Sequence, residues 1–372
     1  MVNSSYSCRS QRTARRRSSA GVRLALGVAA LLFYWAVDPT LLAARDRSTD
    51  TEKSAAELVT PQTASAIDRG LVFLAARQRE DGSFGSGGSD QNVAVCGLAG
   101  MAFIASGSTP GRGPYGRQVD RCLDFILAHT EQSGFIDVAG SNSRGPMYGH
   151  GFATLFLAEC NGMSPRPDLR EKLTRAVNLI VNTQNDEGGW RYKPERASAA
   201  DISVTVCEVM ALRAARNAGL HVPPETMAHA VTFIKKCQNA DGGFKYMLQM
   251  PGAGGASEFP RSAAAVVALY GAGIYEGPEI DNGLRYLRTK IPRGDDFSRE
   301  GYFFYGHYYA VQAMWQAGGE DWSRWYPAIR DALLKRQSDN GSWVDAVSDE
   351  YGTAMATIIL QMPNNYLPIF QR

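Results

Sequence analysis

Several features are missing from this sequence of 372 residues, and each absence excludes a class of protein. No apolar run reaches the ~20 residues that a membrane-spanning helix needs, and the run LALGVAALLFYWAV at 24–37 is too short. The six cysteines form no Cys-x-x-Cys pair, which excludes zinc knuckles and dithiol redox motifs. The formal net charge of +2 gives no strongly basic surface for nucleic acid. A hydrophobic content of 44% instead predicts a sizeable core.

The first 45 residues differ from the rest. Arginines precede the apolar run 24–37, which at ~1.5 Å per residue covers about 21 Å of a ~30 Å hydrocarbon core. With the small residues that follow, this pattern predicts an export signal, and an uncleaved anchor reaching Ala44 is the alternative. Seven of the 39 Lys and Arg but one of the 37 Asp and Glu lie here, so the remaining chain has a formal net charge of −4. We expect an exported protein of the periplasm or cell envelope that binds no nucleic acid and contacts membrane only through its N-terminal segment.

A polar stretch at 46–62 reads as a linker, and residues 63–372 contain a repeat. An apolar template at positions i, i+3, i+4 and i+7 begins at Ile67 and recurs with spacings of 52, 54, 54 and 53 residues. This template is the buried stripe of an amphipathic helix, and its i+3 residue is always small. The copies begin at Ile67, Val119, Leu173, Met227 and Ile280, and a looser sixth copy lies at 325–337.

Each amphipathic copy is followed by a stretch that is apolar nearly all round. A helix without a polar face must be buried on most sides. Six hairpins, each with an amphipathic outer helix and an apolar inner helix, bury these stretches in two concentric rings. The sequence therefore predicts an all-α (α/α)6 toroid, with an open solenoid as the alternative. The predicted inner helices are 91–107, 147–163, 201–219, 259–273, 305–319 and 349–361.

A short motif separates the two helices of a hairpin. Glutamine is followed six residues later by an aromatic residue in QREDGSF (78–84), QNDEGGW (184–190), QNADGGF (238–244) and QSDNGSW (337–343). The glycine supplies a turn with positive φ, the glutamine can satisfy free backbone groups at the helix end, and the ring can fill a gap between hairpins. Too few acids are present for a calcium loop. We interpret the motif as a structural clasp, shortened in repeat two and replaced by 295–303 in repeat five.

These clasps in a six-hairpin array resemble the QW repeats of the terpenoid cyclase and protein prenyltransferase α/α-toroid superfamily. The segments at 146–163, 188–194 and 201–219 are similar to its branch of prenyltransferase and squalene-oxidase repeat, squalene-cyclase C-terminal-like proteins. The resemblance covers about residues 63–365 and implies the toroid fold. It does not imply one reaction, because one fold serves many functions.

The motifs that carry the reactions of this superfamily are missing. No DxDD acid of the class II cyclases occurs, and Asp295 and Asp296 stand in RGDDFS. The prenyltransferase zinc site would need a cysteine two residues after Asp201, where Ser203 stands, while Cys207 lies ~240° further round the helix. We therefore predict no metal site and no cofactor, and the sequence leaves open whether the protein is an enzyme.

The inner helices begin at one end of the barrel, so polar side chains there would converge on its cavity. His150 next to Asp201 could form a general base, and His307 repeats the YGH string of His150. These three are the candidate catalytic residues. The candidate ligand-binding residues are Tyr148, Glu258, Arg261, Tyr305, Tyr308, Tyr309, Glu350 and Tyr351. The alternative is that Asp201 caps a helix and His150 is a hydrogen-bonded interior residue.

The aromatic run GYFFYGHYY at 301–309 favours a hydrophobic ligand, because its rings cover most of a helical turn. We predict a toroid that binds, or binds and transforms, an apolar polyisoprenoid-type molecule or other lipid in its central cavity. A non-catalytic module of the cell envelope that binds a peptide or protein partner is the alternative. A carbohydrate-active (α/α)6 barrel is a third function, which needs two opposed carboxylates ~5 or ~6.5–9.5 Å apart.

Overall fold

The structure is a computed structural model that describes residues 57–139, 141, 145–249, 255–292 and 301–371. The predicted export segment, most of the predicted linker, Asp295 and Asp296 lie outside these residues. Within the described ranges, no helix is both long enough and apolar enough to cross a membrane.

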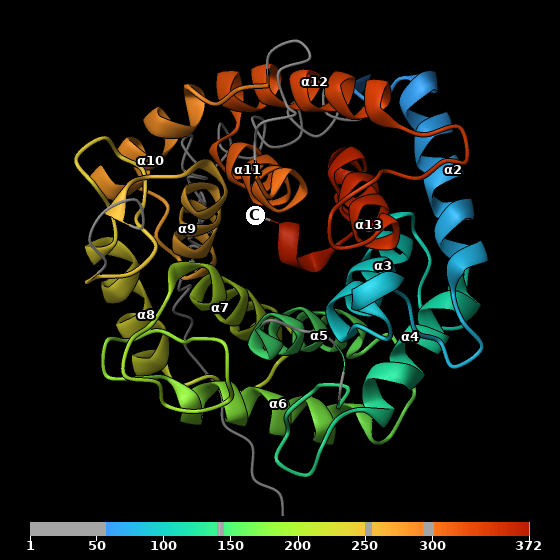
Figure 1. The fold of residues 1–372 in the computed structure, drawn as a ribbon, viewed down its shortest axis with the longest axis horizontal. Coiled ribbons are helices and arrows are strands. Elements are labelled where there is room, and N and C mark those ends of the chain that lie inside the picture. Colours follow the sequence, from blue (N-terminus) through green and yellow to red (C-terminus); the bar gives the residue numbers. More distant parts are fainter. Residues whose placement is uncertain (1–56, 140, 142–144, 250–254, 293–300, 372) are drawn as a thin grey trace, which may run out of the picture. The chain divides into compact units, whose positions relative to one another are not determined.

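The described residues form twelve α-helices that alternate between an outer and an inner ring (Figure 1). The outer helices are α2 (Pro61–Arg77), α4 (Gly116–Ala128), α6 (Leu169–Thr183), α8 (Pro224–Lys236), α10 (Pro278–Arg288) and α12 (Gly319–Arg336). The inner helices are α3 (Val93–Ala105), α5 (Pro146–Cys160), α7 (Ile202–Asn217), α9 (Phe259–Gly271), α11 (Phe303–Ala317) and α13 (Asp349–Leu360). Within these residues β-structure is limited to isolated bridges. The predicted (α/α)6 toroid is confirmed.

The two rings differ in the way the sequence predicts. In α3 every residue except Ala94 is buried, because neighbours surround the inner helices on all sides. The outer helices bury one stripe, and its small i+3 residues permit close approach. A Cβ atom on Gly70 of α2 would lie 2.6 Å from Thr357 Cγ2 of α13. Helix α13 thus packs against α2, which brings the sixth hairpin beside the first (Figure 1).

Each full clasp ties one outer helix to the next. Gln184 Nε2 donates to Gly188 O within its own loop at 2.8 Å and to Thr226 O on α8 at 2.9 Å. The same two bonds recur from Gln78 to Gly82 and Gln118, from Gln238 to Gly242 and Glu279, and from Gln337 to Gly341 and Ala66. The last of these joins α12 to α2. The clasps therefore close the ring, and an open solenoid is excluded.

The glycine and the ring of the clasp are fixed by the same packing. Gly188 has a φ of +95°, and a Cβ atom there would lie 2.4 Å from His229 O on α8. Trp190 is 1% exposed, and its Nε1 donates to Ile180 O at 2.7 Å. Neither the backbone conformation nor the space admits a side chain at the glycine position. The clasp is structural, as the sequence predicts.

The C-terminal segment turns back into the ring. After α13, Asn365 adopts a φ of +53° and reverses the chain. Leu367, Ile369 and Phe370 are buried, and the 3-10 turn Pro368–Phe370 packs against α7. Figure 1 shows this segment, in red, in the middle of the ring. We call the end of the barrel where the inner helices begin the clasp end, and the end that residues 366–371 occupy the tail end.

Candidate functional site

Asp201 lies at the clasp end as the N-cap of α7. Its Oδ1 accepts from Val204 N at 2.9 Å, which satisfies one of the free donors of the first helical turn. Its Oδ2 meets no hydrogen-bond partner among the described residues, although the side chain is fully buried. Burial raises the pKa of Asp201 to about 6, and the Val204 amide and the Arg191 charge offset only part of that rise. Asp201 is therefore a helix cap whose second oxygen is buried beside the Tyr246 side chain.

Six tyrosines form a connected group beside Asp201, and we call them the tyrosine cluster. Three of them lie near enough to Asp201 for its charge to act on them, and the other three adjoin these three. Burial is the main cause that raises the pKa of Tyr148, Tyr246 and Tyr305, and the Asp201 charge raises each further. These phenols are therefore neutral at physiological pH. The cluster comprises Tyr148 on α5, Tyr192 and Tyr246 after two clasps, Tyr305 and Tyr309 on α11, and Tyr351 on α13.

The tyrosine cluster spans the axis of the barrel. Tyr305 Oη donates to Ser203 O of α7 at 3.2 Å, and Tyr309 Oη lies 3.5 Å from Cys207 Sγ one turn further along α7. Helices α7 and α11 belong to hairpins that are not neighbours in the ring, so these contacts cross the interior. The hydroxyls of Tyr192 and Tyr246 are hydrogen-bonded to each other.

Solvent reaches the part of this cluster nearest the clasp end but not the residues deeper in the barrel. Tyr148, Tyr305 and Tyr351 are partly exposed, whereas Tyr308 and Tyr309 are 2% and 1% exposed. The Tyr308 ring packs against Phe152 at 6.2 Å and against Phe370 of the C-terminal segment at 6.3 Å. Beneath the partly exposed tyrosines the interior is therefore filled by aromatic side chains. Tyr308 belongs to this floor and does not line an open cavity.

His150 does not pair with Asp201. Its Nδ1 accepts from Ile136 N at 3.2 Å, and its Nε2 lies 3.2 Å from Ala176 O, to which it donates. Burial lowers its pKa to about 4, so the ring is neutral. Its Nδ1 thus holds the loop between α4 and α5, its Nε2 joins α5 to the outer helix α6, and neither nitrogen is available as a base. Three other hairpins fill the same acceptor position with a hydroxyl, from Thr205, Ser262 and Thr353.

His307 also faces away from the tyrosine cluster. It occupies the place in α11 that His150 occupies in α5. Its ring packs against Phe303 at 4.5 Å, Phe259 at 4.8 Å and Trp325 of α12 at 5.9 Å. The structure therefore brings neither histidine to Asp201.

The predicted charged residues hold loops in place. Arg261 donates to Phe244 O at 3.1 Å and Ala256 O at 2.7 Å, and its Nη1 lies 3.3 Å from the exposed Glu258. Glu350 is buried and accepts from Arg77 and Ser86, at 2.8 and 3.0 Å. These contacts fasten the loop before α9 and the loop between α2 and α3. Of the predicted binding residues, the tyrosines thus reach the interior and the charged ones support its rim.

Comparison with protein families agrees with this architecture. The model of the squalene-hopene cyclase C-terminal domain matches residues 153–303, and that of the prenyltransferase alpha-alpha toroid domain matches residues 51–194. The two matches together span residues 51–303, and they confirm the predicted resemblance to the α/α-toroid superfamily of terpenoid cyclases and prenyltransferases.

Solved structures share this toroid at low sequence identity. The type II terpene cyclase MstE from Scytonema is 15% identical with a TM-score of 0.56, over 83% of this chain and 100% of that one. A variant of that cyclase was determined with geranylgeranyl dihydroxybenzoate. An α-1,6-mannanase of Salegentibacter sp. HEL1_6, in complex with α-1,6-mannotriose, is 8% identical with a TM-score of 0.62, over 81% and 99% of the two chains. At such identities the likeness establishes the fold and not the reaction.

Asp201 and Cys207, the residues compared with the prenyltransferase zinc site, have other partners. Asp201 Oδ1 is engaged by the helix cap, and Cys207 Sγ faces Tyr309 across the barrel. Among the described residues no group of three or more His, Cys, Asp or Glu side chains is placed to bind a metal ion.

Two groups of interior residues escaped the sequence reasoning. Tyr192 and Tyr246 each follow a clasp aromatic by two residues, in WRY and FKY, so the repeat itself could have indicated them. Glu159 and Glu208 are acids in otherwise apolar inner helices, and both are buried. Burial raises the pKa of Glu159 to about 8 and that of Glu208 well above its ordinary value. An acid within a helix that has no polar face was the signal for these two residues.

Proposed function

We propose that the toroid binds an apolar polyisoprenoid-type ligand at its clasp end, against the tyrosine cluster. The observation that carries this proposal is the tyrosine cluster beside Asp201, which is supplied by α5, α11 and α13 (labelled in Figure 1) and by the loops after two clasps. Rings with a polar tip suit a mostly apolar molecule that carries few polar atoms. The bound geranylgeranyl dihydroxybenzoate of the Scytonema cyclase supports a ligand of this class.

Asp201 gives the site one polar contact. Its Oδ2 is buried beside the Tyr246 side chain, so a ligand hydroxyl that displaces this side chain would donate to it. The carboxyl is not suited to protonate an alkene, because a pKa raised to about 6 makes it a weaker acid than an ordinary aspartic acid. The proposal is therefore binding, with Asp201 as the residue that orients the polar end of the ligand.

We further propose that this binding takes place after export, in the periplasm or cell envelope. The basic residues and short apolar run of the first 45 residues support export. N-terminal sequencing of the mature protein tests this part, with cleavage near Ala44 as the expected result. An intact N-terminus on a membrane-bound chain would instead favour the anchor.

Native mass spectrometry of the purified protein tests the binding. We expect a bound hydrophobic molecule, its loss after extraction with detergent, and its replacement by added geranylgeraniol. As a control, α-1,6-mannotriose should not bind, because the tyrosine cluster surrounds a single carboxyl rather than the opposed pair of a glycoside hydrolase. Binding of the sugar and not of the isoprenoid would contradict the proposal.

A further inference from the structure

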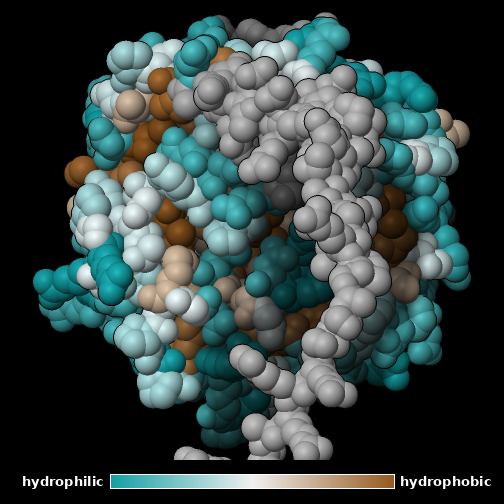
Figure 2. Space-filling model, turned by 180° about the vertical axis from the view of Figure 1, so that it is seen from behind, coloured by the Kyte–Doolittle hydropathy of each residue, from teal (hydrophilic) through white to brown (hydrophobic). Residues whose placement is uncertain are grey.

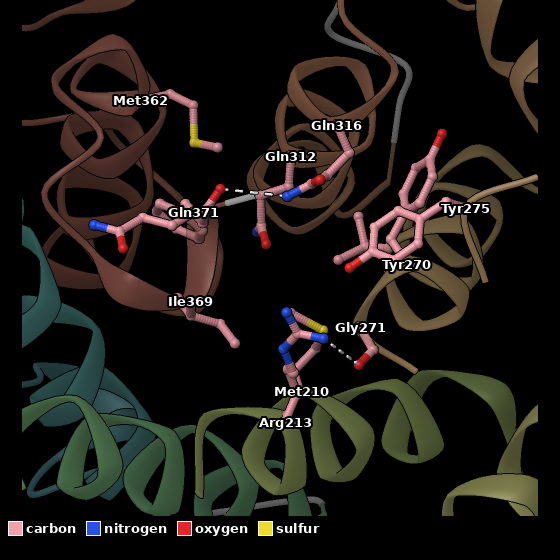
Figure 3. A pocket seen from close by; sticks show the side chains of 12 residues that line it. Met210, Arg213, Tyr270, Gly271, Tyr275, Gln312, Gln316, Met362, Ile369 and Gln371 are labelled. Atoms are coloured by element: carbon pink, nitrogen blue, oxygen red, sulfur yellow. Dashed lines mark hydrogen bonds between the residues drawn. The ribbon is translucent and has the colours of Figure 1, made fainter. Parts of the chain in front are cut away.

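The tail end of the barrel contains a second pocket, separated from the tyrosine cluster by Tyr308 and Phe152. Figure 2 shows this face of the molecule hollowed near its middle, with hydrophilic and hydrophobic atoms around the depression. Side chains from α7, α9, α11 and the C-terminal segment line the pocket (Figure 3). Its volume of about 20 Å³ holds roughly one or two water molecules. The C-terminal segment therefore fills most of the space at this end.

Arg213 supplies the charge of this pocket. Figure 3 shows it rising from α7 towards Gln312 and Gln316 of α11. Its Nη1 donates to Gly271 O at 3.3 Å, and no carboxylate of the described residues pairs with it. The side chains that line the pocket include no acid. A guanidinium with open donors beside amide groups matches an anionic oxygen group.

The rest of the lining combines amide and tyrosine side chains with apolar ones, and the chain's own C-terminal segment supplies part of the apolar wall. Ile369 and Phe370 lie beside Met210 in the lining. The segment is tied to the barrel by Ile369 N donating to Glu159 Oε2 and by Gln316 Nε2 donating to Phe370 O, both at 3.3 Å. Both distances are at the long end of the usual range, so these bonds can be exchanged for others. Burial raises the pKa of Glu159 to about 8, so its carboxyl is protonated at neutral pH and does not repel an anion.

We propose that the tail end is a second binding site, for an apolar chain that ends in an anionic head group such as a carboxylate. The head group binds Arg213 and the amide of Gln316, and the apolar chain takes the space that Ile369 and Phe370 now fill. Glu276 and Asp281 lie in the adjoining groove and not in the pocket, which confines the anion to Arg213. This site does not depend on the function proposed for the clasp end.

Dodecanoate and dodecanol, which share a chain and differ in the head group, test this proposal by titration of the full-length protein. We expect dodecanoate to bind at least ten-fold more tightly than dodecanol, because an arginine–carboxylate bond is charge-assisted. Arg213→Gln should reduce that preference to about two-fold or less and leave dodecanol unchanged. Arg216→Gln is the matched control, since Arg216 is exposed one turn along the same helix. Dodecyl phosphate shows whether the pocket favours carboxylate or phosphate.

Removal of residues 366–372 tests the role of the C-terminal segment. The shortened chain should bind dodecanoate about ten-fold more tightly, because the occupant of the site is gone. Phe370→Ala, which keeps the backbone, should have the same effect in a smaller degree, and the melting temperature shows that each variant is folded. Equal binding of dodecanoate and dodecanol by the wild type would overturn the anionic head group. A folded, shortened chain that gains no affinity would overturn the assignment of its space to the ligand.

Discussion

The clasps repeat around the ring, whereas the side chains of the barrel interior differ between hairpins. In the clasps, four glutamines make the same two hydrogen bonds at four places in the ring. In the interior, the inner helices differ from one another. The position that Tyr148 holds in α5 and Tyr305 holds in α11 is Ser203 in α7, and among the inner helices only α7 has a carboxylate that accepts a capping hydrogen bond, from Asp201. The repeated clasps carry the fold, and the proposed site is built from side chains that vary between hairpins.

The largest effect should come from a clasp. Trp190→Ala removes a ring that is 1% exposed together with its bond to Ile180 O. We expect a loss of ~3–5 kcal/mol in the free energy of unfolding, measured by urea denaturation. Tyr302→Ala is the control, because this tyrosine is 78% exposed and should change stability little. The folded fraction of Trp190→Ala should keep its ligand affinity, and a specific loss of binding would show that the clasp belongs to the site.

The next effect depends on pH and tests whether His150 belongs with the clasps. Its folded-state pKa of about 4 lies below the ordinary 6.5. Above pH 6.5 the ring is neutral in both the folded and the unfolded state, so its titration does not change the stability. As the pH falls from 6.5 to 4, His150 binds a proton in the unfolded chain but not in the folded protein. The free energy of unfolding should therefore fall by ~1.4 kcal/mol per pH unit, about 3 kcal/mol in all.

His150→Thr is the matched variant, because Thr205 and Thr353 accept the clasp N–H in two other hairpins. The readout is the slope of unfolding free energy against pH, which should flatten between pH 6.5 and 4. All other titrating groups are shared by the two proteins, so the difference in slope isolates His150. An unchanged slope would contradict a buried, neutral histidine.

A smaller effect separates backbone conformation from packing in the clasp. Gly188 and Gly219 both have positive φ, of +95° and +77°. A Cβ atom at Gly188 would lie 2.4 Å from His229 O, whereas nothing lies within 4 Å of one at Gly219. Gly219→Ala should lower the free energy of unfolding by ~1 kcal/mol and Gly188→Ala should lower it by about 2–3 kcal/mol, as measured by thermal denaturation. Equal losses would mean that the clasp glycine is needed only for its φ.

The fold could be predicted from the sequence because its determinants are local and repeated. The six-residue spacing from Gln184 to Trp190 occurs in four copies. The inner helices have to be buried because they have no polar face. The ring closure by Gln337 and Ala66 then follows from six similar hairpins. Even the alternative role of His150 as an interior residue could be stated in advance, because it lies in an apolar helix.

The site was less predictable because it depends on contacts between hairpins that are not neighbours. Nothing near Cys207 in the sequence indicates that it meets Tyr309 across the axis. The charged residues Glu258 and Glu350 looked like site residues, yet they pair with Arg261 and Arg77 at helix ends, and the repeat does not predict these pairs. The return of Phe370 onto Tyr308 likewise follows from the turn at Asn365, which no periodic pattern indicates.

The contrast between clasp and interior is tested most directly by one paired measurement on Tyr305→Ala and Trp190→Ala. For each variant the melting temperature and the affinity for geranylgeraniol are measured, with Tyr302→Ala as the exposed control. Tyr305 is partly exposed at the clasp end, so its loss should remove ~1–2 kcal/mol of ligand contact, or about ten-fold in affinity, with a small change in melting temperature. Trp190→Ala should lower the melting temperature and keep the affinity. If Tyr305→Ala instead melts as low as Trp190→Ala and binds geranylgeraniol as the wild type does, the tyrosine cluster is core and the proposed site is wrong.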